Sequence, residues 1–71
     1  MHNERLKMIE FFFNELPEQY RIVMQLRDIE GKSYKEISEI TGQSEEQVKV
    51  NLFRARKRIR QGIEKFEAYG L

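Results

Sequence analysis

Two helix starts set close together constrain the fold of this chain more than any other feature. Ser33 and Glu36 form one capping box, in which each side chain satisfies a free backbone N–H of the other's turn. Ser44 and Gln47 form a second box with the same spacing. Gly42 lies between the two boxes, where a left-handed residue ends a helix. Two helices joined by a short turn that contains glycine are typical of a helix-turn-helix.

The residues before this motif predict two further helices. Apolar residues recur at helical spacing over residues 3–15. Pro17 closes that helix and suits the first turn of the next one, because its missing N–H would have no partner there. The second helix should cover residues 17–28. It is apolar around most of its circumference, so we expect it to be the central helix, packed on more than one side.

The motif itself supplies the third and fourth helices. The third should cover residues 34–41, with Ile37 and Ile40 facing inward. The fourth should cover residues 45–68, with Gly62 as a weak point in its last third. We therefore expect an all-α fold, a four-helix domain with a helix-turn-helix and a long C-terminal recognition helix.

Composition limits what a chain of 71 residues can do. The length suits one domain over residues 1–71 and leaves little room for an enclosed active site. With no cysteine, one histidine (His2) and one aspartate, we find no nucleophile and base pair and no metal site. No apolar run is long enough to span a membrane, and the N-terminus lacks the apolar stretch of a signal peptide. We expect a cytoplasmic domain that is not an enzyme, needs no cofactor and contacts no membrane.

The charges are unevenly distributed along the chain. Residues 1–48 carry six basic and ten acidic side chains, whereas residues 49–60 carry six basic and no acidic ones. A basic run of this kind is often only a solvated helix face. Beside an acidic remainder, however, it is also the electrostatic footprint expected of an element that binds phosphates.

The last helix has two opposite faces. At about 100° per residue, one narrow stripe must face the core; it consists of Val48, Leu52, Ala55 and Ile59. The opposite face and its flanks are the candidate surface for reading DNA; they consist of Glu46, Lys49, Val50, Phe53, Arg54, Lys57, Arg58 and Arg60.

Several side chains near this face match the chemistry of base edges. Arg54 can fork onto a guanine, Asn51 and Gln47 can pair with an adenine, and Glu46 can accept a hydrogen bond from cytosine N4. These residues predict direct readout in the major groove.

The apolar pair on the outward face is more telling. Val50 and Phe53 lie opposite the core stripe and have nothing of their own domain to pack on, and thymine methyl groups would suit them. The alternative is that they dock on another protein or are scattered surface residues. Lys57 and Arg58 lie farther from the start of the helix, where they would contact phosphate or nothing.

The turns should also clamp phosphates. Ser33, Tyr34 and Lys35 begin the helix that crosses the DNA backbone, and Gln43 and Ser44 begin the reading helix. For the two serines, helix capping is the main expected role. For Tyr34, a half-buried place in the core is an equal alternative.

These segments resemble region four of the extracytoplasmic-function sigma factors, the promoter-recognition subunits of bacterial RNA polymerase. The resemblance covers about residues 5–66. Three segments carry it: residues 16–21 (LPEQYR), residues 31–37 (GKSYKEI), and residues 48–49 with 52–56 (VK and LFRAR). They look like the family's opening of the second helix, its turn and third helix, and its reading helix.

The resemblance implies that the domain recognises the minus-thirty-five element of double-stranded promoter DNA, with Lys49, Phe53 and Arg54 at matching contact positions. It also implies docking on the β-subunit flap of the RNA polymerase core and leaves room for capture by an anti-sigma factor. Val50 and Asn51 depart from the serine and arginine that the family often has, so the hexamer that is read should differ from the commonest ones. Nothing in the chain corresponds to a sigma factor's N-terminal domain, so we expect a fragment or a lone C-terminal domain.

Two other functions remain open at this point. Helix-turn-helix output domains of response regulators share the Val-Lys spacing and the short third helix, although the basic run over residues 54–60 fits the sigma pattern better. A helical protein-interaction module could instead hold a partner helix with Phe11, Phe12 and the last helix.

Overall fold

The computed structural model describes residues 4–69 and is helical throughout. Its elements, in chain order, are α1 (Glu4–Glu15), α2 (Glu18–Met24), the π-helical turn η1 (Gln25–Ile29), α3 (Tyr34–Thr41) and α4 (Glu45–Tyr69). The all-α fold class is confirmed, because these residues form four α-helices and no strand.

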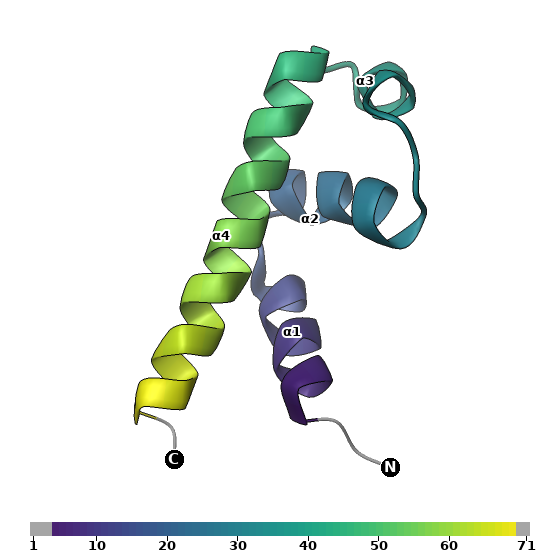
Figure 1. Cartoon of the computed structure of the whole chain (residues 1–71). Helices are drawn as coiled ribbons and strands as arrows, with labels where there is room; N and C mark the ends of the chain where they lie inside the picture. The colour runs from purple at the N-terminus through teal and green to yellow at the C-terminus, as the bar shows by residue number, and fades with distance from the viewer. Residues whose placement is uncertain (1–3, 70–71) are drawn as a thin grey trace.

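The long helix α4 is the axis on which the other helices pack (Figure 1). It runs beside α3 at its N-terminal end, crosses α2 near its middle and lies beside α1, in the opposite direction, at its C-terminal end. Two buried clusters follow this arrangement. One holds Val23, Ile37, Val48 and Leu52, and the other holds Leu16, Ala55, Ile59 and Ile63.

The core stripe predicted for α4 is confirmed, because all four of its residues are buried. The predicted central role of the second helix is also confirmed. Met24 packs against both clusters, and Val23 lies within one of them. One apolar stripe on α4 therefore contributes to both clusters. Its N-terminal part packs against the helices of the helix-turn-helix, and its C-terminal part packs against α1.

The second helix differs from the prediction in how it ends. Pro17 is its N-cap, and the regular α-helix stops at Met24. Five further residues form the π-helical turn η1. Its i→i+5 hydrogen bond runs from the N–H of Glu30 to the carbonyl oxygen of Gln25, at 3.0 Å. A hydrophobic pattern does not reveal such a turn, because the apolar residues keep nearly the same spacing. At the other end of the domain, residue 3 of the predicted first helix lies outside the described residues.

Ile40 does not face inward, so that prediction is wrong. Its side chain is 57% exposed, whereas Ile37 is fully buried. The helix α3 has only two turns and meets the rest of the domain along one side, which Ile37 occupies. Ile40 instead lines a shallow depression together with Ile22 of α2.

Gly62 does not interrupt α4, which continues to Tyr69. Its lack of a side chain lets α1 approach closely. A Cβ atom at this position would lie 2.7 Å from Cδ1 of Phe12. Glycine is therefore required at this crossing by packing, which offsets its unfavourable helix propensity. Within residues 4–69, no helix is long and apolar enough to cross a membrane.

Candidate nucleic-acid interface

The start of α3 has the capping box that the sequence predicts. The hydroxyl of Ser33 accepts from the backbone N–H of Glu36 at 3.1 Å, and the Glu36 carboxylate accepts from the N–H of Ser33 at 2.9 Å. The backbone N–H of Ser33, together with its hydroxyl and the nearby charge of Lys32, lowers the pKa of Glu36. The cap fixes the direction in which α3 leaves the turn.

The turn between α3 and α4 follows the expected glycine chemistry. Gly42 has a φ of 76° and ends α3 in the left-handed conformation. The start of α4 has only half of its predicted capping box. The Ser44 hydroxyl accepts from the N–H of Gln47 at 3.1 Å, but the side chain of Gln47 donates to Asn51. Asn51 lies one helical turn farther along α4, and this i,i+4 amide pair competes with the capping box for the Gln47 side chain.

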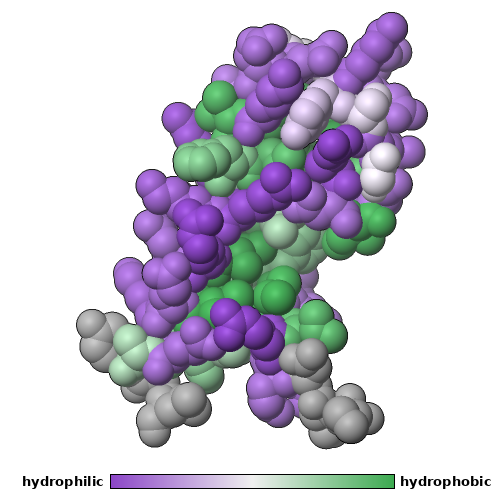
Figure 2. All heavy atoms as spheres, viewed as in Figure 1, coloured by the Kyte–Doolittle hydropathy of each residue, from purple (hydrophilic) through white to green (hydrophobic). Residues whose placement is uncertain are grey.

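The outward face of α4 lies where the sequence places it. Val50 is 40% exposed and Phe53 is 64% exposed. Glu46, Arg54 and Lys57 are exposed around them. Figure 2 shows apolar surface on the outer side of the upper part of α4, surrounded by hydrophilic atoms. The first half of α4 therefore presents an apolar centre with cations beside it.

Asn51 is not on that outward face. It is 4% exposed, and its side-chain amide is hydrogen-bonded to both Gln43 and Gln47. Asn51 is therefore not accessible for direct pairing with an adenine, and that expectation is wrong. At about 100° per residue, position 51 is close in angle to the buried Val48 and Ala55, so it turns toward α3.

Tyr34 occupies the half-buried place in the core that the sequence left open as one alternative. Its ring is half-buried against the cluster that contains Val48. The Arg27 guanidinium lies over the ring at 4.5 Å from its centroid, and the Lys49 ammonium lies over it at 5.3 Å. Tyr34 thus draws two cations to the start of α3, where Lys35 is also exposed.

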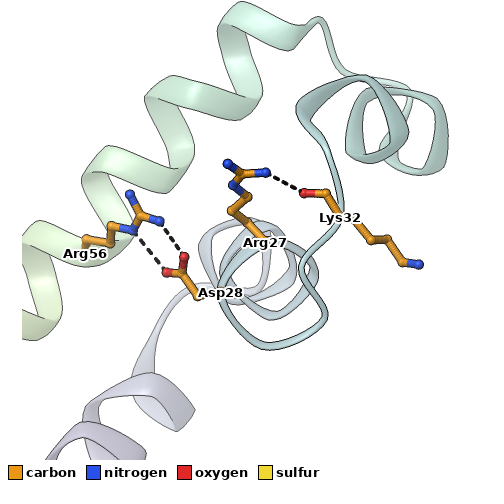
Figure 3. A network of polar contacts seen from close by, with 4 residues as sticks. All are labelled: Arg27, Asp28, Lys32 and Arg56. Atoms are coloured by element: carbon orange, nitrogen blue, oxygen red, sulfur yellow. Dashed lines mark hydrogen bonds and ion pairs between the residues drawn. The ribbon is translucent and has the colours of Figure 1, made fainter.

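Sequence reasoning did not find Arg27. Its side chain also donates to the carbonyl oxygen of Lys32 at 2.9 Å, which ties η1 to the turn before α3 (Figure 3). An isolated arginine in an apolar helix carries no signal of this role, because its partners Lys32 and Tyr34 are brought near it only by the fold.

The basic run on α4 is divided between two tasks. Arg56 turns away from the outward face and reaches Asp28 of η1, with a 3.0 Å bond from Nε and a second bond from Nη2 (Figure 3). Hydrogen bonding to Asp28 raises the pKa of Arg56. The guanidinium of Arg58 lies 5.3 Å from the ring centroid of Tyr20, on the side of α2. Arg54 and Lys57 remain beside the apolar pair on the outward side.

This arrangement is suited to binding duplex DNA. An α-helix fits a major groove, and the outward face of the first half of α4 carries an apolar centre, hydrogen-bond donors and cations. The start of α3 adds further cations for phosphates. Among residues 4–69, no cluster of three or more histidine, cysteine or carboxylate side chains could hold a metal ion.

A family model agrees with this geometry. The family described as "Sigma-70, region 4" matches residues 6–59. The match begins in α1, includes the helix-turn-helix and ends at residue 59 of α4. No curated protein and no solved structure gave a significant match.

Proposed function

The chain belongs to the sigma-70 region 4 family, and from this membership we propose that it reads the minus-thirty-five promoter element. Region 4 is a promoter-binding region of sigma factors, which direct transcription initiation. We place the domain in the extracytoplasmic-function class, acting in the cytoplasm as part of a sigma factor. The observation that carries the proposal is the exposed pair of Val50 and Phe53 on the second helix of the motif, with cations beside it.

Direct readout is assigned to the first half of α4. Arg54 forks onto a guanine, Gln47 pairs with an adenine and Glu46 accepts from a cytosine. Val50 and Phe53 contact thymine methyl groups, which are the apolar features of the major groove.

Phosphate contacts are assigned to residues around the readers, at the helix starts and farther along α4. They are Ser33, Tyr34, Lys35, Gln43, Ser44, Lys49, Lys57 and Arg58. The cations among them neutralise phosphates and position the domain, and the backbone N–H groups at the helix starts assist.

Selection of bound sequences from a random duplex pool tests this function. We expect one short motif, and an affinity for that motif that falls steeply as salt rises. Placed at the minus-thirty-five position of a promoter, the motif should make transcription depend on the sigma factor that carries this domain. The control variant is Lys65→Ala, which removes a cation from the far end of α4 and should leave the motif unchanged. No enriched motif, or a salt slope near zero, would support the protein-interaction module instead.

The polymerase contact is assigned to an apolar groove between α1 and the end of α4. Met8, Phe11, Phe12 and Phe66 line it. Ile63, on the same part of α4, is buried in the core and does not line the groove. An amphipathic helix, such as one from the β-subunit flap, can lay its apolar face into a groove of this kind.

A titration with a flap-helix peptide tests the docking. The amide resonances of residues around Phe11 and Phe66 should shift, and Phe11→Ser should reduce these shifts. The depression lined by Ile22 and Ile40 is the internal control. Shifts confined to that depression would contradict the assignment. An anti-sigma factor that captured the domain here would compete with the peptide.

A further inference from the structure

Three side-chain amides form a chain at the start of α4. The Gln47 side chain donates from Nε2 to Oδ1 of Asn51 at 2.9 Å. Asn51 in turn donates from Nδ2 to Oε1 of Gln43 at 3.3 Å. Asn51 is the buried centre of this chain, and the two glutamines extend from it toward the surface.

The backbones of both glutamines are fixed as well. The Gln43 carbonyl accepts from the Ser38 hydroxyl, and the Gln43 N–H donates to the hydroxyl of Thr41 at 3.3 Å. The Gln47 N–H donates to the Ser44 cap. Each glutamine is therefore held at its backbone and, through one hydrogen bond to Asn51, at the end of its side chain.

The Asn51 amide makes one hydrogen bond through each of its two polar atoms. Replacing a buried, hydrogen-bonded amide by an apolar side chain of similar shape costs little stability when its former partners can reach water. Within the described residues, no buried side-chain nitrogen or oxygen lacks a partner. What the amide adds is direction, because it accepts from one neighbour and donates to the other.

Because Asn51 accepts from Gln47 and donates to Gln43, the two glutamines keep different hydrogen-bonding groups free. Gln47 uses one N–H on Asn51 and keeps its carbonyl oxygen and second N–H, which is the pair that reads an adenine. Gln43 uses its carbonyl oxygen and keeps its NH₂ group as a donor. A free glutamine side chain would lose rotamer entropy on binding a base, whereas these two have lost part of it before DNA arrives.

We propose that Asn51 is a positioning residue for base recognition, which orients Gln43 and Gln47 without touching DNA itself. The proposal rests on the proposed function, because it assumes that the start of α4 faces DNA. It assigns part of the sequence preference to a residue that no base can reach.

Selection from a random duplex pool with Asn51→Leu tests the proposal. Leucine keeps the branched shape and removes both hydrogen bonds. Preference at the bases that face Gln43 and Gln47 should fall about tenfold, while preference at the Arg54 position and the salt slope stay as in the wild type. The matched control is Asn14→Leu, the same change at an exposed site on α1. An unchanged preference in Asn51→Leu would overturn the proposal, as would a uniform loss of binding at every position.

The first of two further measurements uses only the wild-type protein and does not depend on the folding of Asn51→Leu. In the wild-type protein, ¹⁵N relaxation should show that the side-chain NH₂ groups of Gln43 and Gln47 are more rigid than that of exposed Gln61. Equal mobility would overturn the proposal. Gln47→Ala should relax the same base position as Asn51→Leu, and the double variant should lose no more preference there. If the wild-type protein selects no motif at all, the proposed function fails and not only this inference.

Discussion

Phe53 has the highest exposed fraction of the large hydrophobic side chains in residues 4–69. It is 64% exposed on a helix whose buried face is already complete. Burying an aromatic ring against a partner is favourable by a few kcal/mol, so such a residue usually marks a contact surface. At this position on α4, a thymine methyl group is a partner of suitable size and polarity.

We therefore predict that Phe53 responds to single methyl groups in DNA. Replacing one thymine of the selected motif by uracil removes only a methyl group and should weaken binding of the wild-type domain. Phe53→Ala should bind less selectively and should be indifferent to the same replacement, with nearly the same salt slope. The measurement is a fluorescence anisotropy titration of both proteins on both duplexes. Equal weakening of the two proteins at every thymine would assign the ring to another partner.

Arg54 and Lys57 should fail in different ways when they are removed. On the proposed function, Arg54 is close enough to the start of α4 to enter the groove, whereas Lys57 is almost a turn farther along and would meet the DNA backbone. Arg54→Ala should cost about 1–3 kcal/mol on the selected motif and relax one base position. Lys57→Ala should weaken all sequences alike and lower the salt slope by about one unit. Identical profiles for the two variants would refute this division of roles.

At the scale of the elements, α3 depends on a cap whose strength changes with pH. The pKa of Glu36 is lower in the folded state than its ordinary value of 4.5. Its charge therefore contributes stability above that value, and this contribution is lost as the pH falls through the lower, folded pKa.

We predict that Glu36→Gln removes this acid sensitivity. Glutamine can still complete the capping box, but it does not titrate. Near neutral pH the variant should melt at a slightly lower temperature than the wild type, and the difference should disappear as the pH falls below 4.5. The control is Glu39→Gln, an exposed change on the same helix. A melting difference that is constant from neutral to acid pH would contradict the prediction.

At the crossing of α1 and α4, close packing favours glycine although helix propensity disfavours it. Gly62→Ala raises helix propensity by roughly 1 kcal/mol but drives a methyl group into the ring of Phe12, which costs about 1–3 kcal/mol. We expect a net loss of about 1 kcal/mol in the free energy of unfolding, measured by urea denaturation.

Phe12→Leu provides the matching background for this test. Without the ring, Gly62→Ala should become neutral or stabilising by up to about 1 kcal/mol. A similar effect of Gly62→Ala in both backgrounds would show that the crossing does not require glycine.

At the scale of the whole molecule, the helices of residues 4–69 include a single candidate reading helix, α4. A single helix makes few base contacts, so the isolated domain should bind its motif only in the micromolar range or more weakly at physiological salt. Attachment to polymerase would raise its effective concentration at the promoter to about millimolar without adding a base contact. Anisotropy titrations of the isolated domain and of the complete holoenzyme would measure the difference. Nanomolar binding by the isolated domain would contradict this account.

The sequence by itself determined the features that depend on short stretches of chain. Helix α3, the box at Ser33, the left-handed Gly42 and the buried stripe of α4 all follow from capping chemistry and the helical repeat. The exposure of Val50 and Phe53 follows from the same repeat, because a residue opposite a buried stripe has no core to enter. The four-helix fold and its motif were therefore predictable.

Only the tertiary structure decided which polar side chains serve the fold and which remain available for DNA. Arg56 belongs to the same basic run as Lys57, yet it pairs with Asp28, which is 28 positions away. Asn51 and Ile40 exchange their expected environments, because the position of α3 against α4 buries the first and leaves the second exposed. The Arg56–Asp28 contact joins residues far apart in sequence, and neither periodicity nor capping spacing carries information about it or about how α3 packs against α4.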